Sequence, residues 1–362
     1  MTQLDEQAAD LTTDTRRDPT MTDVAEKAGV SQTTVSLVLN GAVGARLSVE
    51  TRQRVQEAAD ALGYRLVKRA TNRAASLDKR LIAVVVDELT TDPWCAIAID
   101  SIRDKVWENG LAMQVSVTRG DPEIEEAVFA QIASQPLFGM IYGRILTHKI
   151  TPRPAFYRQP TVLMNCYLAD KSVPSFVPSE VLGARVATEC LIEAGHRRIA
   201  LIEGQSHTEV SRDRLKGYKQ ALASHDLPFD PELVRPGNWE PSAGYERALE
   251  LMRLREPPTG IWCSNDLTAM GAYEALRELG LRVPEDVSVV GYDDRTIAHF
   301  LRPPLTTVVL PHGEIGQLAA DYLIDNAQAG VFPTHQTKVP GPLIRRASVA
   351  PPPANAERRK NG

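Results

Sequence analysis

The sequence predicts a small helical head followed by a large α/β body. The first observation is a set of three short helical segments within residues 21–64, and the second is an alternation of β-rich runs with amphipathic helices from residue 81 onward. The third is the composition: 43% of the 362 residues are hydrophobic and 24% are charged, as in folded globular domains. No run approaches the roughly 18 consecutive apolar residues of a membrane helix, and the acidic N-terminus lacks the apolar core of a secretory signal.

The net charge of −5 conceals a basic segment near the N-terminus. Residues 16–80 contain 12 Lys and Arg against 7 Asp and Glu, whereas the rest of the chain is acidic overall. A basic segment on an acidic body indicates a nucleic-acid contact at one end of the chain.

The cysteines are widely spaced and never form C-x-x-C, so we expect buried thiols in a reducing cytoplasm rather than a zinc site or disulfides. They are Cys95, Cys166, Cys190 and Cys263.

Start and stop signals define the helices of the head. The first covers about residues 22–28 and ends at Gly29, the second runs from Ser31 to the Asn40-Gly41 pair, and the third runs from Ser48 to Gly63. A serine at a helix start accepts a hydrogen bond from a backbone N–H that otherwise lacks a partner. The third segment has an apolar face with helical spacing, formed by Val55, Ala58, Ala59 and Leu62.

Two short helices joined by a glycine turn form the helix-turn-helix pattern, whose second helix enters the major groove of DNA. We expect a small core of Val24, Ala25, Val30, Val35 and Val38. The outward residues of the second helix are then Gln32, Thr33, Ser36 and Leu37. Gln32 can pair with an adenine edge, and Thr33 can bind a base or touch a thymine methyl. The short polar groups suited to phosphate contacts are Thr20, Ser31, Thr34, Ser36 and Asn40. The alternative is a three-helix bundle with a solvated polar face.

Changes of composition predict the domain boundaries. Residues 1–19 are polar and form a flexible arm, 20–64 form the DNA-binding domain, and 65–80, which are basic and poor in large apolar groups, form a hinge or linker. Residues 81–349 form the body, and the Pro-rich, basic residues 350–362 form a disordered tail.

The body reads as a series of βα units. The predicted strands are Leu81–Val86, Ala112–Val117, Gly139–Tyr142, Thr161–Met164, Arg198–Ile202, Gly260–Cys263 and Val287–Gly291, with a further run near Leu233–Arg235. The predicted helices between them include Glu180–Ala194, Arg212–Ser224, Ala243–Leu254 and Leu267–Leu279. This alternation indicates a parallel sheet, in one large domain or two stacked ones.

Ligands of parallel sheets bind beyond the carboxyl ends of the strands. The loops that follow these strands are DELTTDPWC, EGQSHTEVSRDR, GNWEPSAGY, SND and YDD. They offer aromatic rings, an arginine, an amide and carboxylates. Such a set suits a polyhydroxylated ligand, because a ring can stack on its apolar face while polar groups bind its hydroxyls.

The segments TDVAEKAGVSQTTVSLVLNG and TRQRVQEAADALGY resemble the N-terminal signature of the lac repressor and purine repressor (LacI/GalR) family. The resemblance continues through EAGHRRIALIEG, SNDLTAMGAYEAL, GLRVPEDVSVVGYDD and PPLTTVVLP. It implies two parallel-sheet lobes around a cleft, similar to a periplasmic-binding-protein type I fold. It also implies a cytoplasmic homodimer that binds a near-palindromic, double-stranded operator.

The same resemblance implies a set of ligand-binding residues. The arginine of the family's cleft falls on Arg214, the stacking aromatic on Trp239, the amide on Asn265 and the carboxylate on Asp293. Trp94 falls in the aromatic-containing loop of the first half. Thr208 stands near the position where purine-binding relatives carry an arginine, which favours a carbohydrate over a purine as the effector.

Two departures from the family concern DNA. Leu37 stands where the family usually has an arginine that reads a guanine, so we expect a methyl contact instead. In the linker, Leu66-Val67 replaces a Pro-Asn pair, and Arg73 stands where the family has a leucine that wedges into the minor groove. An arginine does not unstack bases as leucine does, so we expect Lys68, Arg69 and Arg73 to contact phosphates.

Motifs of catalysis are absent from the sequence, including the P-loop, G-x-G-x-x-G, G-x-S-x-G and H-E-x-x-H, and no histidines have metal-ligand spacing. We therefore expect a ligand-responsive repressor without enzyme activity, cofactor or metal. The remaining alternative is a sugar or nucleoside sensor with weak or lost specific DNA binding. We also expect Asp266 to cap a helix, His196 to hydrogen-bond locally, and Asp293 to cap or to pair with Arg214 when no ligand is bound.

Overall fold

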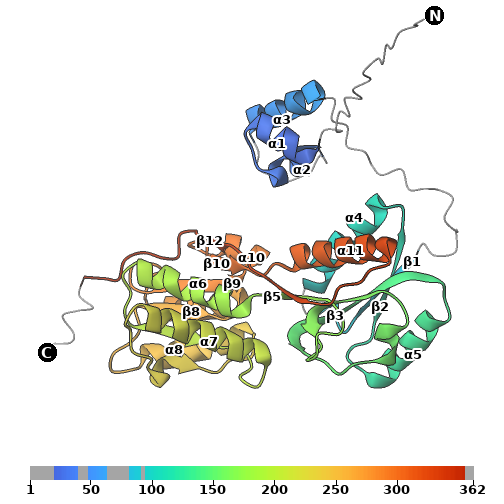
Figure 1. Ribbon diagram of the computed structural model, residues 1–362. Coiled ribbons are helices and arrows are strands. Elements are labelled where there is room, and N and C mark those ends of the chain that lie inside the picture. Colours follow the sequence, from blue (N-terminus) through green and yellow to red (C-terminus); the bar gives the residue numbers. More distant parts are fainter. Residues whose placement is uncertain (1–19, 40–47, 63–80, 91–93, 355–362) are drawn as a thin grey trace, which may run out of the picture. The chain divides into compact units, whose positions relative to one another are not determined.

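The computed structural model describes residues 20–39, 48–62, 81–90 and 94–354 (Figure 1). The chain divides into two compact units, residues 1–73 and 74–362, which we call the head and the body. The predicted arm 1–19, the linker 65–80 and four predicted DNA contacts (Asn40, Lys68, Arg69 and Arg73) lie outside the described residues. So do the side chains of Thr33, Leu37 and Trp94.

The head consists of α1 (Met21–Ala28), α2 (Gln32–Leu39) and α3 (Val49–Leu62). Thr20 caps α1 by a reciprocal pair of hydrogen bonds with Asp23, and the helix ends at Gly29, whose φ of 65° lies in the left-handed region that glycine tolerates. The predicted core is confirmed, since its valines and alanines are buried or half-buried. The described members of this core are Met21, Val24, Ala25, Ala28, Val30, Val35, Val38, Leu39, Val55, Ala58, Ala59 and Leu62.

The body contains two six-stranded sheets, so the two-lobed expectation is confirmed. In the first lobe the strand order is β11-β5-β4-β3-β1-β2, and every pairing is parallel. These strands are β1 (Leu81–Val86), β2 (Ala112–Val117), β3 (Leu137–Lys149), β4 (Thr161–Tyr167), β5 (Ser175–Pro178) and β11 (Gln336–Val339).

In the second lobe the order is β12-β10-β9-β8-β6-β7, and only β12 runs antiparallel to its neighbour. These strands are β6 (Ile199–Ile202), β7 (Val234–Arg235), β8 (Gly260–Cys263), β9 (Ser288–Asp293), β10 (Thr306–Val309) and β12 (Leu343–Ile344).

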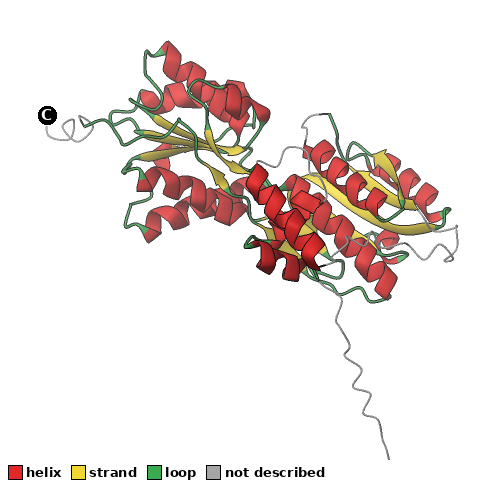
Figure 2. Ribbon diagram, turned by 90° about the horizontal axis from the view of Figure 1, so that it is seen from above, coloured by secondary structure: helices red, strands yellow, loops and turns green. Residues whose placement is uncertain are grey.

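Helices cover both faces of each sheet (Figure 2). In the first lobe α4 (Trp94–Glu108) and α11 (His312–Ala329) pack together on one face and α5 (Pro122–Ala133) on the other. In the second lobe α6 (Glu180–Glu193) and α7 (Glu209–Ser224) cover one face. The opposite face is covered by α8 (Pro241–Met252), α9 (Asp266–Glu278) and α10 (Thr296–Phe300). Within the described segments, no helix combines the length and apolarity that crossing a membrane requires.

The chain crosses between the lobes after β5, after β10 and after β11. Both lobes therefore contain segments far apart in sequence, and α11 returns to complete the first lobe. The sequence analysis missed β5, β10, β11 and β12. They are two to four residues long and, unlike the equally short β6, contain no run of four consecutive apolar residues, so the sequence pattern does not mark them.

The C-terminal segment corrects two expectations. The tail does not begin at residue 350, because the carbonyl of Ala350 accepts a hydrogen bond from Ser288 Oγ at 3.1 Å and its N–H donates to the same oxygen. The backbone N–H of His196 does bond locally, to the Leu191 carbonyl at 3.1 Å, but its imidazole does not. The side chain is fully buried, with Nδ1 2.9 Å from Thr259 Oγ1 and Nε2 2.9 Å from the carbonyl oxygen of Ala350. The expected burial of all four cysteines is confirmed.

Candidate DNA-reading helix and ligand cavity

The start of α2 carries exposed polar side chains. Ser31 Oγ accepts the Thr34 N–H at 3.2 Å and lies 2.9 Å from Thr34 Oγ1, so these two predicted phosphate contacts also cap the helix. Gln32 is exposed at the first turn, and Ser36 is half-buried. Val35, about one turn further along the helix than Gln32, is fully buried in the head. The helix thus presents Gln32 to solvent while its apolar side holds it to the core.

A cavity of about 300 Å³ lies between the two lobes of the body. It opens at the carboxyl ends of strands from both sheets, as parallel sheets predict. Four of the predicted ligand-binding residues line it together: Arg214, Trp239, Asn265 and Asp293. The structure does not bring Thr208 there. Thr208 instead caps α7, where its hydroxyl accepts the Ser211 N–H and donates to the carbonyl of Gln205.

Arg214 is almost completely buried, and its charge is compensated by a carboxylate that the sequence did not reveal. Its Nε donates to Glu180 Oε2 at 2.7 Å, its Nη1 donates to the carbonyl of Ser264, and its guanidinium lies 3.8 Å from the ring centroid of Tyr292. Burial alone would lower the pKa of Arg214, but the neighbouring negative groups, above all Glu180, raise it. The expected pairing of Arg214 with Asp293 is therefore replaced by a buried ion pair with Glu180.

The Arg214 guanidinium lies over the Trp239 ring, with 5.4 Å between the guanidinium carbon and the ring centroid, so the two side chains form a cation–π contact in the cavity wall. Trp239 has a φ of 73°, an uncommon conformation for a bulky residue. Only glycine fits beside the indole at position 204, because a Cβ there would lie about 2 Å from the ring carbons. The indole N–H is buried and has no hydrogen-bond partner within the described residues.

Asn265, rather than Asp266, caps α9. Asn265 Oδ1 accepts the Thr268 N–H at 2.8 Å, and its Nδ2 donates to the carbonyl of Trp239 at 2.9 Å. Asp266 is fully buried instead, where its carboxylate accepts the Thr307 hydroxyl and the Arg295 N–H, both at 2.6 Å. Burial raises the pKa of Asp266, and these two hydrogen bonds oppose the rise. Asn265 is the cap because it is the extended residue immediately before the helix. A side chain at that position can reach the first backbone N–H groups of the helix, which otherwise lack partners.

Asp293 lies at the end of β9, with Oδ2 3.4 Å from Arg295 Nε. His312, at the start of α11, completes this side of the cavity and was missed by the sequence analysis. Burial and the positive charge of Arg214 lower the pKa of His312 to about 3, so the imidazole is neutral at pH 7. His312 follows a crossing between the lobes, which the sequence alone does not place.

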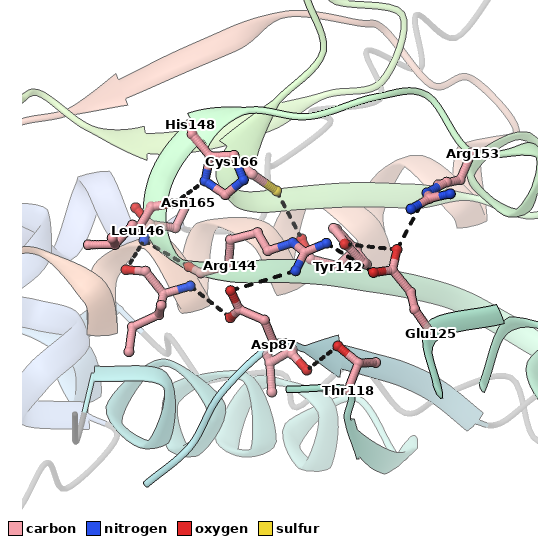
Figure 3. Close-up of polar contacts among 12 residues, drawn as sticks. Asp87, Thr118, Glu125, Tyr142, Arg144, Leu146, His148, Arg153, Asn165 and Cys166 are labelled. Carbon is pink, nitrogen blue, oxygen red and sulfur yellow. Dashed lines mark hydrogen bonds and ion pairs between the residues drawn. The ribbon is translucent and has the colours of Figure 1, made fainter. Parts of the chain in front are cut away.

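The first lobe contributes the segment 145–147 and Asn165 to the cavity. Between Gly143 and His148 the pairing of β3 with β4 is interrupted, and polar groups hold the freed backbone (Figure 3). Asp87 Oδ1 accepts the Ile145 N–H at 2.8 Å, and Asn165 Nδ2 donates to the carbonyls of residues 144 and 145, both at 2.8 Å. Side chains from the end of β1 and from β4 therefore fix the backbone of this wall.

Behind this wall lies a buried ion cluster. Arg144 lies between two carboxylates (Figure 3), with Nη2 3.0 Å from Glu125 Oε2 and Nη1 3.7 Å from Asp87 Oδ2. Tyr142 donates to Glu125 at 3.1 Å, and Arg153 approaches the same carboxylate at 3.5 Å. Burial raises the pKa of Asp87, and the Arg144 charge opposes this. Arg144 is thereby held away from the cavity, inside the first lobe.

Comparison with known proteins agrees with this architecture. The family described as "Bacterial regulatory proteins, lacI family" matches residues 20–65, and the "Periplasmic binding protein-like domain" matches residues 188–349. The HTH-type transcriptional repressor PurR of Haemophilus influenzae (strain PittEE) is 30% identical over 335 residues, covering 91% of this chain and 98% of the relative.

Two solved structures are also similar. The complex of the transcriptional regulator CelR with cellobiose has a TM-score of 0.64 and 29% identity, covering 91% of this chain and 99% of that one. The lac repressor dimer bound to operator and the anti-inducer ONPF has a TM-score of 0.66 and 29% identity, covering 92% and 100%.

A helix-turn-helix head and two parallel-sheet lobes around a cavity define the class of two-part, ligand-binding transcriptional regulators. The chain belongs to the LacI family of bacterial regulatory proteins. That family consists of DNA-binding repressors and not of enzymes.

Proposed function

We propose that this chain is a cytoplasmic repressor that binds a near-palindromic operator as a homodimer, and that a carbohydrate in the interlobe cavity controls its affinity for DNA. The observation that carries the proposal is the cavity between the lobes, which is lined by the Trp239 ring and by polar side chains from both lobes. An aromatic face and hydrogen-bonding groups in one enclosed space suit a sugar. Because the cavity walls belong to both lobes, a ligand there favours one lobe arrangement over another.

The relatives support the same assignment. The similar CelR structure contains cellobiose, and the similar lac repressor structure is a dimer bound to operator. Dimerisation of this chain would place two heads on two half-sites, since one head reads too few bases for useful specificity. The sensor without specific DNA binding is not favoured, because the head keeps a buried core and exposes Gln32 at the start of α2.

For the DNA complex we assign base contacts to Gln32, Thr33 and Leu37. Thr20, Ser31, Thr34, Ser36 and Asn40 are assigned to phosphates. In the linker, Lys68, Arg69 and Arg73 are assigned to the DNA backbone, where they add to the salt dependence of binding. In the cavity, Trp239, Arg214, Asn265 and Asp293 are the proposed ligand contacts, and Trp94 is retained as a further one.

The proposal is tested by measuring both sites on one preparation. Selection from random duplexes identifies the operator, and thermal-shift screening of carbohydrates and nucleosides identifies the effector. The effector should then change operator affinity about 5- to 150-fold, which is the usual range of such coupling. Trp239→Ala should remove the effector response and keep operator binding. An effector that binds without changing operator affinity would contradict the proposal.

A further inference from the structure

The charged groups of the cavity wall do not balance. Carboxylates outnumber guanidinium groups, and the wall has no lysine among the described residues. The carboxylates belong to Glu88, Glu180, Glu240 and Asp293, and the guanidinium groups to Arg214 and Arg295. The formal charge of the wall is therefore negative.

Both positive groups of the wall already have negative partners. Arg214 forms its 2.7 Å ion pair with Glu180, where each side chain is less than 5% exposed. Arg295 Nε lies 3.4 Å from Asp293 Oδ2, and both of these side chains are largely buried. His312 adds no positive charge at pH 7, because its pKa is lowered to about 3 by burial and by Arg214.

Two carboxylates remain without compensation. Glu88 follows β1 and is half-buried, and Glu240 precedes α8 and is exposed. Neither forms an ion pair with any residue that the structure describes. They belong to opposite lobes, so any ligand held between the lobes is placed between two negative charges.

The neutral groups of the wall suit hydroxyls. The Trp239 indole N–H is a buried donor without a partner in the described residues, and the Gln205 side chain also faces the cavity without a hydrogen bond among them. Asn165 and Asn265 hold backbone groups, and Asn238 Oδ1 accepts the backbone N–H of Glu240 at 3.0 Å.

We propose that the cavity accepts an uncharged polyhydroxylated ligand and rejects the phosphorylated form of the same compound. This inference rests on the proposed function and specifies its ligand class. A phosphate monoester carries a charge of about −1.5 to −2 at pH 7, and among the described residues of the wall both arginines are already paired with carboxylates. The effector of the repressor is then the unphosphorylated compound, which is present before a phosphoryl-transfer reaction converts it.

The test compares matched pairs by calorimetry on the full chain: D-ribose with ribose 5-phosphate, D-glucose with glucose 6-phosphate, and cellobiose with cellobiose 6-phosphate. We expect at least one neutral member to bind, with its phosphorylated form at least about tenfold weaker. Equal or tighter binding of a phosphorylated member overturns the inference. Failure of all neutral members at about 10 mM also overturns it.

A charge variant separates electrostatic rejection from a steric limit. Glu88→Gln combined with Glu240→Gln should raise the affinity for the phosphorylated member relative to the neutral one about fivefold. Glu232→Gln combined with Glu285→Gln is the matched control, because both side chains are exposed and precede their strands at the opposite edge of the second sheet. An unchanged ratio in the cavity variant would overturn the electrostatic basis. Operator binding, measured separately, tests the proposed function itself.

Discussion

The hydroxyl of Tyr167 donates a hydrogen bond to Glu209 across the two lobes, with 2.5 Å between the oxygens. Tyr167 ends β4 of the first lobe, and Glu209 begins α7 of the second. The other carboxylate oxygen of Glu209 accepts the backbone N–H of Lys149 at 3.2 Å. One carboxylate thus joins two strand ends of the first lobe to a helix of the second, beside the cavity. This contact stabilises the lobe arrangement seen here.

Tyr167→Phe should shift the lobes towards opening, because it removes a hydrogen bond to a charged group. We expect a shift of about fivefold in the open-to-closed ratio, allowing for partial solvent exposure. Hydrogen exchange at the Lys149 amide is the direct measurement, and exchange there should become faster. The control is Tyr245→Phe, which removes a hydrogen bond of equal length to Glu278 within the second lobe. Unchanged exchange at Lys149 would show that the contact does not hold the lobes.

Arg214→Met should destabilise the body by about 3–5 kcal/mol, because it leaves the Glu180 carboxylate buried without its partner. Adding Glu180→Gln to Arg214→Met should recover part of this loss, since the uncompensated charge is then gone. Urea unfolding of the wild type, both single variants and the double variant measures the coupling. Additive losses would contradict a direct ion pair.

Acid should destabilise the body through His196. Burial lowers the pKa of His196 to about 4, whereas an unfolded histidine titrates near 6.5. Because the depressed value belongs to the folded state, the stabilisation is complete above about pH 6.5 and is lost as the pH falls towards 4. The loss amounts to about 3 kcal/mol at most for this group.

His196→Gln should reduce that loss, measured as the free energy of unfolding at a series of pH values. Part of the acid sensitivity should remain, because the pKa of His312 is lowered in the same direction. The same substitution at the exposed His225 is the control. A pH profile identical to that of the wild type would rule out His196 as a source of acid sensitivity.

Gln32→Ala should relax the preference for one base pair of the operator and weaken binding by about 1–3 kcal/mol, because a bidentate contact to a base edge is lost. Selection from random duplexes, compared between variant and wild type, measures the preference at each position. Gln56→Ala, at an exposed position of α3, is the control for general effects on the head. An unchanged preference at every position would remove Gln32 from base reading.

The loops that carry the candidate site could be predicted from the sequence, because the direction of a parallel sheet places the loops after its strands at one edge. The particular residues Arg214, Trp239, Asn265 and Asp293 were implied by the family resemblance, and all four line the cavity. The ion-pair partner of Arg214 was not predicted, because Glu180 lies 34 residues away in the sequence, on the neighbouring helix.

Thr208 was expected at the cavity but caps α7, and Asp266 was expected to cap α9 but is buried against Thr307 and Arg295. Both outcomes depend on the backbone direction over two or three residues, which the sequence pattern does not show.

By itself, the sequence determined the three helices of the head, their small core, and the βα alternation of the body, since these depend on periodicity and capping within a few residues. Only the tertiary structure decided that the strands divide between two sheets, because short strands such as β5 and β11 take their partners from segments more than 150 residues apart. The same long-range packing decided which charges are neutralised. Glu180 compensates Arg214, while Glu88 and Glu240 remain uncompensated in the described structure, and that difference sets the charge of ligand that the cavity accepts.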